Sequence, residues 1–212
     1  MHVEGISAEV QASLELVGQT PLAAQFYLAG GTAAALHLGH RRSYDLDFFS
    51  PAPFDKSAPR RFLGSLGRLV VDQEGEDTFL GTLNDVRISF FIYPYRLLAP
   101  PVLFGAVQVV ALEDLAVMKL DAIASRGRKR DFIDLYFMCR DFLTLREMLP
   151  LVERKYEGVK YNFTHLVKSL MYFEDAEADP MPEMLKPVSW PDVRRFFEQE
   201  AIRLFRTQIH AD

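Results

Sequence analysis

The sequence predicts an α+β fold in which a mixed sheet with flanking helices is followed by a helical C-terminal half. We place the boundary between residues 1–111 and residues 112–212. In the first part, short stretches alternate apolar and polar residues, and Asn84 and Asp85 form a two-residue turn signal typical of a β-hairpin. From residue 112 to about residue 180, glycine and proline become scarce and apolar residues recur at helical spacing.

The elements are predicted in order along the chain. In the first half we expect helices over 7–18, 32–38 and 55–66 and strands over 25–29, 45–49, 68–73, 78–83, 86–93 and 107–111. In the second half we expect helices over 112–125, 130–142, 144–154 and 161–175, then a proline-rich segment, then a last helix over 191–206.

Composition narrows the class of protein. The 212 residues are 49% hydrophobic and 12% aromatic, which is ample for folded cores. The single cysteine, Cys139, leaves no internal disulfide, and the N-terminus lacks a basic region followed by an apolar run. No apolar stretch approaches the roughly 20 residues of a membrane span. We therefore expect a cytoplasmic protein with no membrane partner.

The net charge of the chain is compatible with nucleic-acid binding only at a local basic patch. The net charge of -5 argues against a surface that coats RNA as a whole. A basic cluster of Arg126, Arg128, Lys129 and Arg130 could still hold an RNA end. The alternative is that this cluster is a solvated junction between two helices.

Asp45 and Asp47 are the strongest candidates for a metal site. In a strand over 45–49, side chains alternate between faces, so the two carboxylates lie on one face about 6–7 Å apart while Leu46 and Phe48 point into a core. Two adjacent anionic oxygen donors suit a hard divalent cation such as Mg²⁺. Two aspartates one apart are also common on an exposed strand face, so the pair alone is weak evidence.

Gly30, Gly31 and Thr32 lie where a strand passes into a helix. Glycine lets the backbone approach a phosphate closely, and the free amides of a helix N-terminus attract anions. A glycine pair alone is more often an ordinary turn. The order of this turn and the aspartate pair, within about fifteen residues, is the more specific signal.

Two cations fall on the apolar stripe of the helix predicted over 112–125. At 100° per residue, Lys119 and Arg126 fall on the same face as the apolar residues, so each needs an anion. These apolar residues are Leu112, Leu115, Ala116 and Ile123. Asp131 and Asp134 are the nearest partners in sequence. The cations either serve phosphates of a ligand or, as the structural alternative, Lys119 extends toward water and Arg126 pairs with an aspartate to hold two helices together.

The order strand, Gly-Gly-Thr, helix and Asp-x-Asp strand is similar to the signature of the polymerase-β-like nucleotidyltransferase superfamily. Residues 29–36 and 42–49 resemble the AbiEii/AbiGii nucleotidyltransferase toxin family, and residues 119–122 and 130–136 resemble its second conserved block. Residues 172–190 also resemble its short members, so the resemblance covers most of the chain. It implies a nucleotidyltransferase fold for the mixed sheet.

The resemblance also implies an activity: Mg²⁺-dependent transfer of NMP from an NTP to an acceptor such as the 3′ end of tRNA, by the toxin of an abortive-infection or toxin-antitoxin pair with a cognate antitoxin. Carried over by position, Asp45 and Asp47 hold one or two Mg²⁺ ions and are catalytic together with Lys119 and Asp131. The residues implied to contact substrate are Gly30, Gly31, Thr32, Arg42, Ser43, Arg126 and Arg130.

One position departs from the superfamily pattern. A neighbouring central strand usually supplies a third carboxylate, whereas the strand predicted over 86–93 offers Ser89. Either Asp131 substitutes, or the protein binds nucleotide or a partner with weak or no turnover. Transfer to a small molecule or to a protein is a further alternative, because the acceptor surface is not part of the shared motif.

Overall fold

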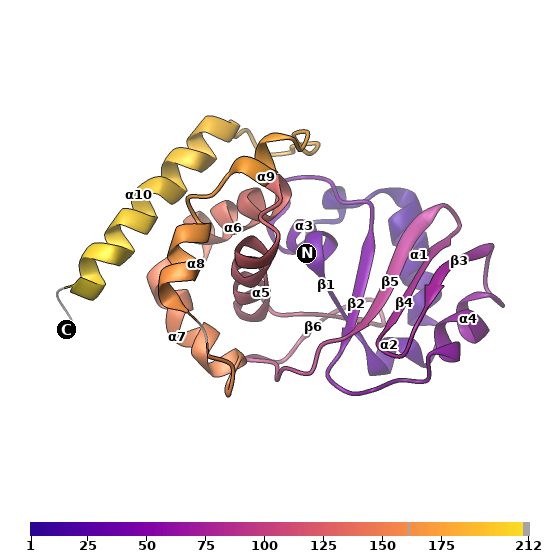
Figure 1. The fold of residues 1–212 in the computed structure, drawn as a ribbon. Coiled ribbons are helices and arrows are strands. Elements are labelled where there is room, and N and C mark those ends of the chain that lie inside the picture. Colours follow the sequence, from indigo (N-terminus) through magenta and orange to yellow (C-terminus); the bar gives the residue numbers. More distant parts are fainter. Residues whose placement is uncertain (161, 210–212) are drawn as a thin grey trace. The chain divides into compact units, whose positions relative to one another are not determined.

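The computed structural model describes residues 1–160 and 162–209, with side chains described through residue 206. The chain forms two compact units, residues 1–111 and residues 112–212, and each is described by itself (Figure 1).

The first unit is built on a mixed sheet. Its helical segments are η1 (Val3–Gly5), α1 (Ala8–Gly18), α2 (Leu22–Gln25), α3 (Gly30–Leu38) and α4 (Ser57–Leu63). Its strands are β1 (Tyr27–Ala29), β2 (Leu46–Ser50), β3 (Leu69–Glu74), β4 (Thr78–Leu83), β5 (Val86–Ile92), β6 (Val102–Phe104) and β7 (Val107–Val109). They lie in the order β3-β4-β5-β2-β1-β7-β6, with β1 parallel to β7, β2 parallel to β5, and antiparallel pairing elsewhere. The predicted α+β class with a mixed sheet is confirmed.

Strand register separates a core face from a polar face. Leu28, Phe48 and Phe90 are cross-strand neighbours, and all three are fully buried. The Phe48 and Phe90 rings stack with centroids 5.0 Å apart. Asp47 and Ser89 come directly before Phe48 and Phe90 in β2 and β5 and are themselves partners in register. They lie on the opposite face because side chains alternate along a strand. The core row therefore fixes which face carries Asp47.

The β-hairpin predicted at Asn84 and Asp85 is confirmed, and the structure has three short elements that the sequence did not predict. Asn84 and Asp85 have φ values of 48° and 69°, the left-handed pair that joins β4 to β5 in a tight turn. The segments η1, α2 and β6 have three or four residues each, too few for a period to show. The helix predicted from residue 32 begins two residues earlier, at Gly30.

The second unit is helical, as predicted. Its helices are α5 (Leu112–Ser125), α6 (Lys129–Asp141), α7 (Leu145–Lys155), α8 (Phe163–Ser169), α9 (Glu174–Glu177) and α10 (Trp190–Ile209). Helix α5 packs against α6, α7 and α8, while α10 packs against α6 and α8 (Figure 1). Helices α5 and α7 are also joined by a buried ion pair, Lys155 Nζ to Asp114 Oδ1 at 2.6 Å.

The single helix predicted over 161–175 is wrong in its continuity, and its first residue lies outside the described residues. Helix α8 ends at Ser169, and two tight turns precede α9. The break places Phe173 in a ring cluster, 5.2 Å from Phe132 and 5.8 Å from Trp190. Burial of that ring outweighs helical propensity, a tertiary effect that local sequence does not report.

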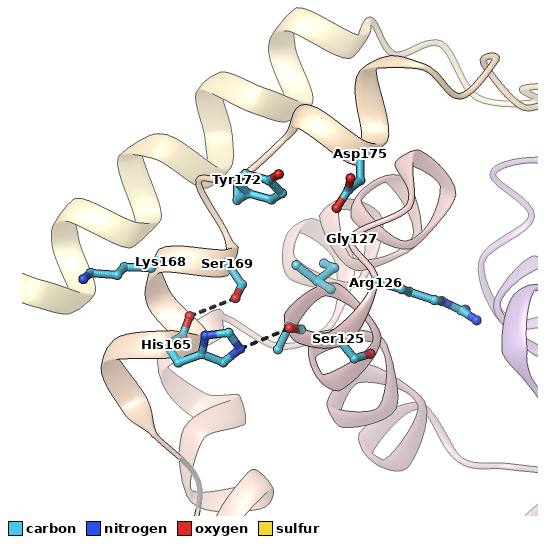
Figure 2. Close-up of a pocket in the computed structure, with 10 residues that line it drawn as sticks. Ser125, Arg126, Gly127, His165, Lys168, Ser169, Tyr172 and Asp175 are labelled. Atoms are coloured by element: carbon cyan, nitrogen blue, oxygen red, sulfur yellow. Dashed lines mark hydrogen bonds between the residues drawn. The ribbon is translucent and has the colours of Figure 1, made fainter.

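A cavity of about 370 Å³ lies in the second unit between the C-terminal end of α5 and the segment from α8 to α9 (Figure 2). Among the described residues, no helix combines the length and apolar content needed to span a bilayer.

Candidate functional site

The turn from β1 into α3 brings Gly30 against Asp47. Gly30 has φ +66°, a conformation that L side chains rarely adopt. A Cβ placed on Gly30 would lie 2.6 Å from Asp47 Oδ2, so the carboxylate sits directly on this glycine. Ala29 and Asp47 are register partners in β1 and β2, which explains the close approach. The carboxylate therefore lies at the N-terminus of α3.

Gly31 is packed in the same way by two polar side chains. A Cβ on Gly31 would lie 2.7 Å from Arg41 Nη2 and 3.2 Å from Ser43 Oγ. Arg41 is buried, with 3% of its surface exposed, and its Nη1 donates to the carbonyl of Arg42 at 3.0 Å. The first turn of α3 thus has a carboxylate on one glycine and a guanidinium and a hydroxyl on the next.

Thr32 ties this turn to the segment that carries the aspartates. Its buried hydroxyl lies 2.9 Å from Ser43 Oγ and donates to the Asp45 carbonyl at 2.5 Å. On the other side, the Ser43 amide donates to the Gly5 carbonyl at 2.9 Å. These bonds set the path of the chain into β2, and so they position both aspartates.

Asp45 precedes β2, whereas Asp47 lies within it. The strand begins at Leu46, one residue later than predicted, and Leu46, Phe48 and Ser50 are buried while Asp47 is half-buried. Asp45 is half-buried as well. Within β2 the period of two therefore separates Asp47 from the core residues, while a shared face with Asp45 stays a prediction.

Ser89 occupies the place beside Asp47 on the neighbouring strand. Asp47 and Ser89 are partners in the parallel pairing of β2 with β5. Within residues 1–160 and 162–209, histidine, cysteine, aspartate and glutamate form no group of three suited to a metal. The sheet thus offers the Asp47 carboxylate and the Ser89 hydroxyl at neighbouring positions, with Asp45 two residues before Asp47 in the chain.

Arg41 lies at this turn although the sequence analysis did not single it out, and a substrate contact by Arg42 stays a prediction. The signal was available in the spacing, since Arg41 and Ser43 are in phase with Asp45 and Asp47 along an extended segment and Arg42 is not. Ser43 does form an isolated parallel bridge with Ile6, which confirms that the segment is extended there. Arg42 is half-buried and supplies the carbonyl that Arg41 bonds.

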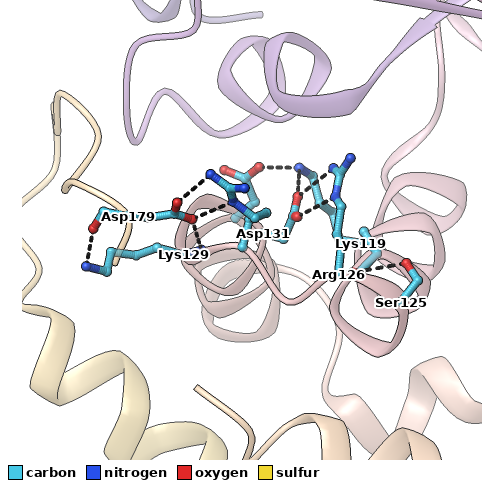
Figure 3. A network of polar contacts seen from close by, with 9 residues as sticks. Lys119, Ser125, Arg126, Lys129, Asp131 and Asp179 are labelled. Carbon is cyan, nitrogen blue, oxygen red and sulfur yellow. Dashed lines mark hydrogen bonds and ion pairs between the residues drawn. The ribbon is translucent and has the colours of Figure 1, made fainter. Parts of the chain in front are cut away.

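In the second unit, Lys119 lies between two buried carboxylates (Figure 3). Its Nζ is 2.8 Å from Asp131 Oδ1 and 2.6 Å from Asp134 Oδ2, and all three side chains are almost fully buried. Lys119 therefore points inward, as the helical stripe predicted, and does not extend to water. Asp131 and Asp134 are the partners that the sequence indicated.

Arg126 completes this network from the outside. Its Nε and Nη2 donate to the two oxygens of Asp131 at 3.0 and 3.3 Å (Figure 3). Helix α5 ends at Ser125, so Arg126 follows the helix and its side chain is 56% exposed, contrary to the expected inward position. Burial opposes ionisation of Asp131, but the charges of Lys119 and Arg126 outweigh it and hold its pKa below the usual value.

The remaining cations of the basic cluster are largely engaged within the protein. Arg128 makes a two-pronged ion pair with Asp179, with Nε at 2.8 Å from Oδ2. Lys129 is buried, donates to the carbonyls of Asp179 and Glu177, and lies 5.2 Å from the centre of the Trp190 ring. Arg130 is exposed. This arrangement supports the helix-junction alternative for most of the cluster.

Comparison with known proteins identifies the family of this chain. The family model described as nucleotidyl transferase AbiEii toxin, type IV toxin-antitoxin system, matches residues 15–203. An uncharacterised protein of Aquifex aeolicus (strain VF5) is 38% identical over 200 residues, which cover 92% of this chain and 95% of that protein.

Solved structures show the same fold. MenT4, a nucleotidyltransferase toxin of Mycobacterium tuberculosis H37Rv, superposes with a TM-score of 0.59 at 18% identity, covering 92% of this chain and 82% of MenT4. JHP933 of Helicobacter pylori superposes with a TM-score of 0.55 at 15% identity, covering 95% of this chain and 92% of that chain. The extent of the family match shows that this chain belongs to the AbiEii nucleotidyltransferase toxin family.

Proposed function

We propose that this nucleotidyltransferase moves a nucleoside monophosphate from an NTP to the 3′ end of tRNA in a Mg²⁺-dependent reaction, as the toxin of a toxin-antitoxin pair in the cytoplasm. Family membership and the likeness to a nucleotidyltransferase toxin support the reaction class. The observation that carries the proposal is the Asp47 carboxylate lying on Gly30 at the N-terminus of α3.

The turn combines what a triphosphate needs. The first amides of α3 have no partner within the helix and carry partial positive charge, so they favour phosphate oxygens. Gly30 and Gly31 have no side chains to hold a ligand away from those amides. The Arg41 guanidinium beside Gly31 adds a full positive charge, in a planar form that matches phosphate oxygens.

The carboxylates suit Mg²⁺. Mg²⁺ prefers oxygen donors and is usually held by one or two carboxylates together with substrate phosphates, so Asp45 and Asp47 suffice as protein ligands for one or two ions. The Ser89 hydroxyl beside Asp47 is a further oxygen donor. When bound there, Mg²⁺ offsets phosphate charge and lowers the pKa of an attacking hydroxyl.

The other residues of the first unit position these groups. Thr32 fixes the backbone of Asp45 through its hydrogen bond, and Ser43 lies between Thr32 and the Gly31 turn. Holding the carboxylates and the phosphate amides in place before substrate binds lowers the reorganisation that the reaction requires. A catalytic role for Lys119 and Asp131 remains a prediction from the family resemblance.

The test is transfer of label from α-³²P NTPs to bulk tRNA with Mg²⁺, comparing the wild-type protein with Asp47→Asn. We expect a loss of at least about a hundredfold, as is usual when a group acting on developing charge is removed. Asp72→Asn is the matched control, because Asp72 is an exposed aspartate on β3 of the same sheet. Undiminished transfer by Asp47→Asn would overturn the mechanism.

The position of Ser89 favours a second candidate, a protein of this fold that binds nucleotide or a partner with little turnover. A third carboxylate would neutralise more of the charge of the bound metal ions. Here the strand partner of Asp47 is a serine, Ser89. Calorimetry, the labelling assay and a growth assay together distinguish the candidates. Saturable NTP binding in calorimetry, with no labelled product on any RNA and no growth arrest on expression, supports the binding protein. Product formation excludes it.

A further inference from the structure

The cavity of the second unit has the size of a small-ligand site. Its volume of about 370 Å³ lies at the low end of the roughly 300–1,000 Å³ found for ligand pockets. Ile123 forms part of an apolar floor, and the polar lining comes from the end of α5, from α8 and from the start of α9. All of its lining residues belong to the second unit.

The end of α5 gives the cavity a negative wall. The last carbonyls of a helix carry partial negative charge, and α5 ends at Ser125. The Ala124 carbonyl lies 3.2 Å from His165 Nε2, which holds the imidazole of His165 against this helix end (Figure 2). Gly127, with φ +52°, then turns the chain away beside the cavity.

Asp175 and Tyr172 add to the negative character. Figure 2 shows the Asp175 carboxylate directed toward the cavity from α9, with the Tyr172 ring beside it. Tyr172 is half exposed, and its hydroxyl donates to Glu174 at 2.9 Å. That hydrogen bond, with the charges of Asp175 and Glu174, raises the pKa of Tyr172. The face of a neutral aromatic ring attracts cations.

The two cationic lining residues do not offset this charge inside the cavity. Arg126 extends away from it and bonds Asp131 through Nε and Nη2 (Figure 2). Lys168 also extends outward from α8 (Figure 2). The Asp175 carboxylate and the Tyr172 ring therefore lie beside the space next to the C-terminal end of α5, while the charged ends of Arg126 and Lys168 extend away from it (Figure 2).

We propose that this cavity binds a small organic cation carrying primary ammonium groups, held by the Asp175 carboxylate, the Tyr172 ring and the carbonyls at the end of α5. An ammonium group donates three hydrogen bonds and is attracted by a ring face, which matches these groups. An anion is disfavoured at a helix C-terminus beside a carboxylate. This site is independent of the proposed nucleotidyl transfer.

Calorimetric titration of the intact chain with spermidine, without NTP, tests the proposal. We expect saturable binding at one site and no binding of an uncharged diol of similar length. Asp175→Asn should weaken binding about tenfold, because it removes the charge but keeps the shape. Tyr172→Ala should weaken it about two- to fivefold, and Tyr172→Phe should retain it because the ring remains.

Glu153→Gln on α7 is the control, since Glu153 is an exposed acid of the same unit outside the cavity lining. It should leave the spermidine affinity unchanged. Three results with spermidine overturn the proposal: no saturable binding, equal affinity for wild type and Asp175→Asn, or equal weakening by Glu153→Gln, which would indicate attraction by net charge alone. AMP binding that is lost in the cavity variants would overturn it too.

Discussion

Gly30 is required for two separate reasons, its positive φ and its contact with Asp47. Gly30→Ala forces a Cβ into the left-handed region at a cost of about 1–2 kcal/mol and pushes the Asp47 carboxylate away. We expect lower stability in urea unfolding and loss of nucleotidyl transfer. Gly105→Ala separates the two reasons, because Gly105 has φ +59° with open space around it.

That control should lose similar stability and keep full transfer activity. If Gly105→Ala and Gly30→Ala reduce activity equally, the contact between Gly30 and Asp47 has no role in the reaction, and backbone strain alone explains the glycine.

Arg41 and Arg42 provide a second comparison between neighbours. Arg41 lies against Gly31, so Arg41→Gln should raise the KM for NTP about tenfold, the range of a lost hydrogen bond to a charged group. Arg42→Gln should have a smaller effect, because Arg42 is out of phase with Ser43 and the aspartates. Steady-state kinetics at fixed tRNA, with urea unfolding as a check on folding, measures both. A larger effect from Arg42→Gln would contradict this assignment.

Some residues of the candidate site could be predicted from local sequence patterns, and others could not. Asp45, Asp47, Gly30 and Gly31 were predictable because a period of two and a glycine turn are local patterns. The contact between Asp47 and Gly30 depends on the register of β1 with β2, which no local pattern reports. The position of Arg41 beside Gly31 also follows the period of two, but its contact with the glycine depends on the fold.

At the scale of elements, long periodic segments were predictable and short ones were not. In strand β2 and helix α5 the alternation of apolar and polar residues continues over enough residues to indicate which face is buried. Strand β6, with three residues, exists because it pairs with β7. The split between α8 and α9 follows from burial of Phe173, a contact with residues distant in sequence.

The pairing of α5 with α6 leads to a pH prediction. The folded-state pKa of Asp131 lies below its unfolded value, so the stability it contributes is fully present above the unfolded pKa of about 3.9 and is lost as pH falls through the folded pKa. Asp131→Asn should cost about 1.5–3 kcal/mol at pH 7, the range for a lost hydrogen bond to a charged group, because Lys119 then keeps only Asp134. Below pH 4 the difference from wild type should shrink.

Urea unfolding at pH 7 and at several values below pH 4 measures this difference. Glu177→Gln is the control, since Glu177 pairs with Arg194 at 2.8 Å on the surface and should change stability by less than about 1 kcal/mol. A gap between wild type and Asp131→Asn that stays constant with pH would show that Asp131 is not ionised in the folded protein.

At the scale of the whole molecule, charge and its pairing bear on how RNA is held. The chain carries 24 basic and 29 acidic residues, so attraction of RNA depends on local cations. The four cations of the cluster at 126–130 suggest an RNA surface in sequence. In the structure, Arg126, Arg128 and Lys129 are engaged with Asp131, Asp179 and backbone carbonyls.

We therefore expect tRNA binding to depend only weakly on salt, with a slope of log K against log salt of about −1.4 to −2.1, as two or three phosphate contacts to a single strand would give. Filter binding between low and physiological salt measures the slope. Arg128→Gln should leave it unchanged, because that guanidinium is committed to Asp179. A slope steeper than about −5 that flattens in Arg128→Gln would show instead that the ion pair opens and that the cluster binds the RNA backbone.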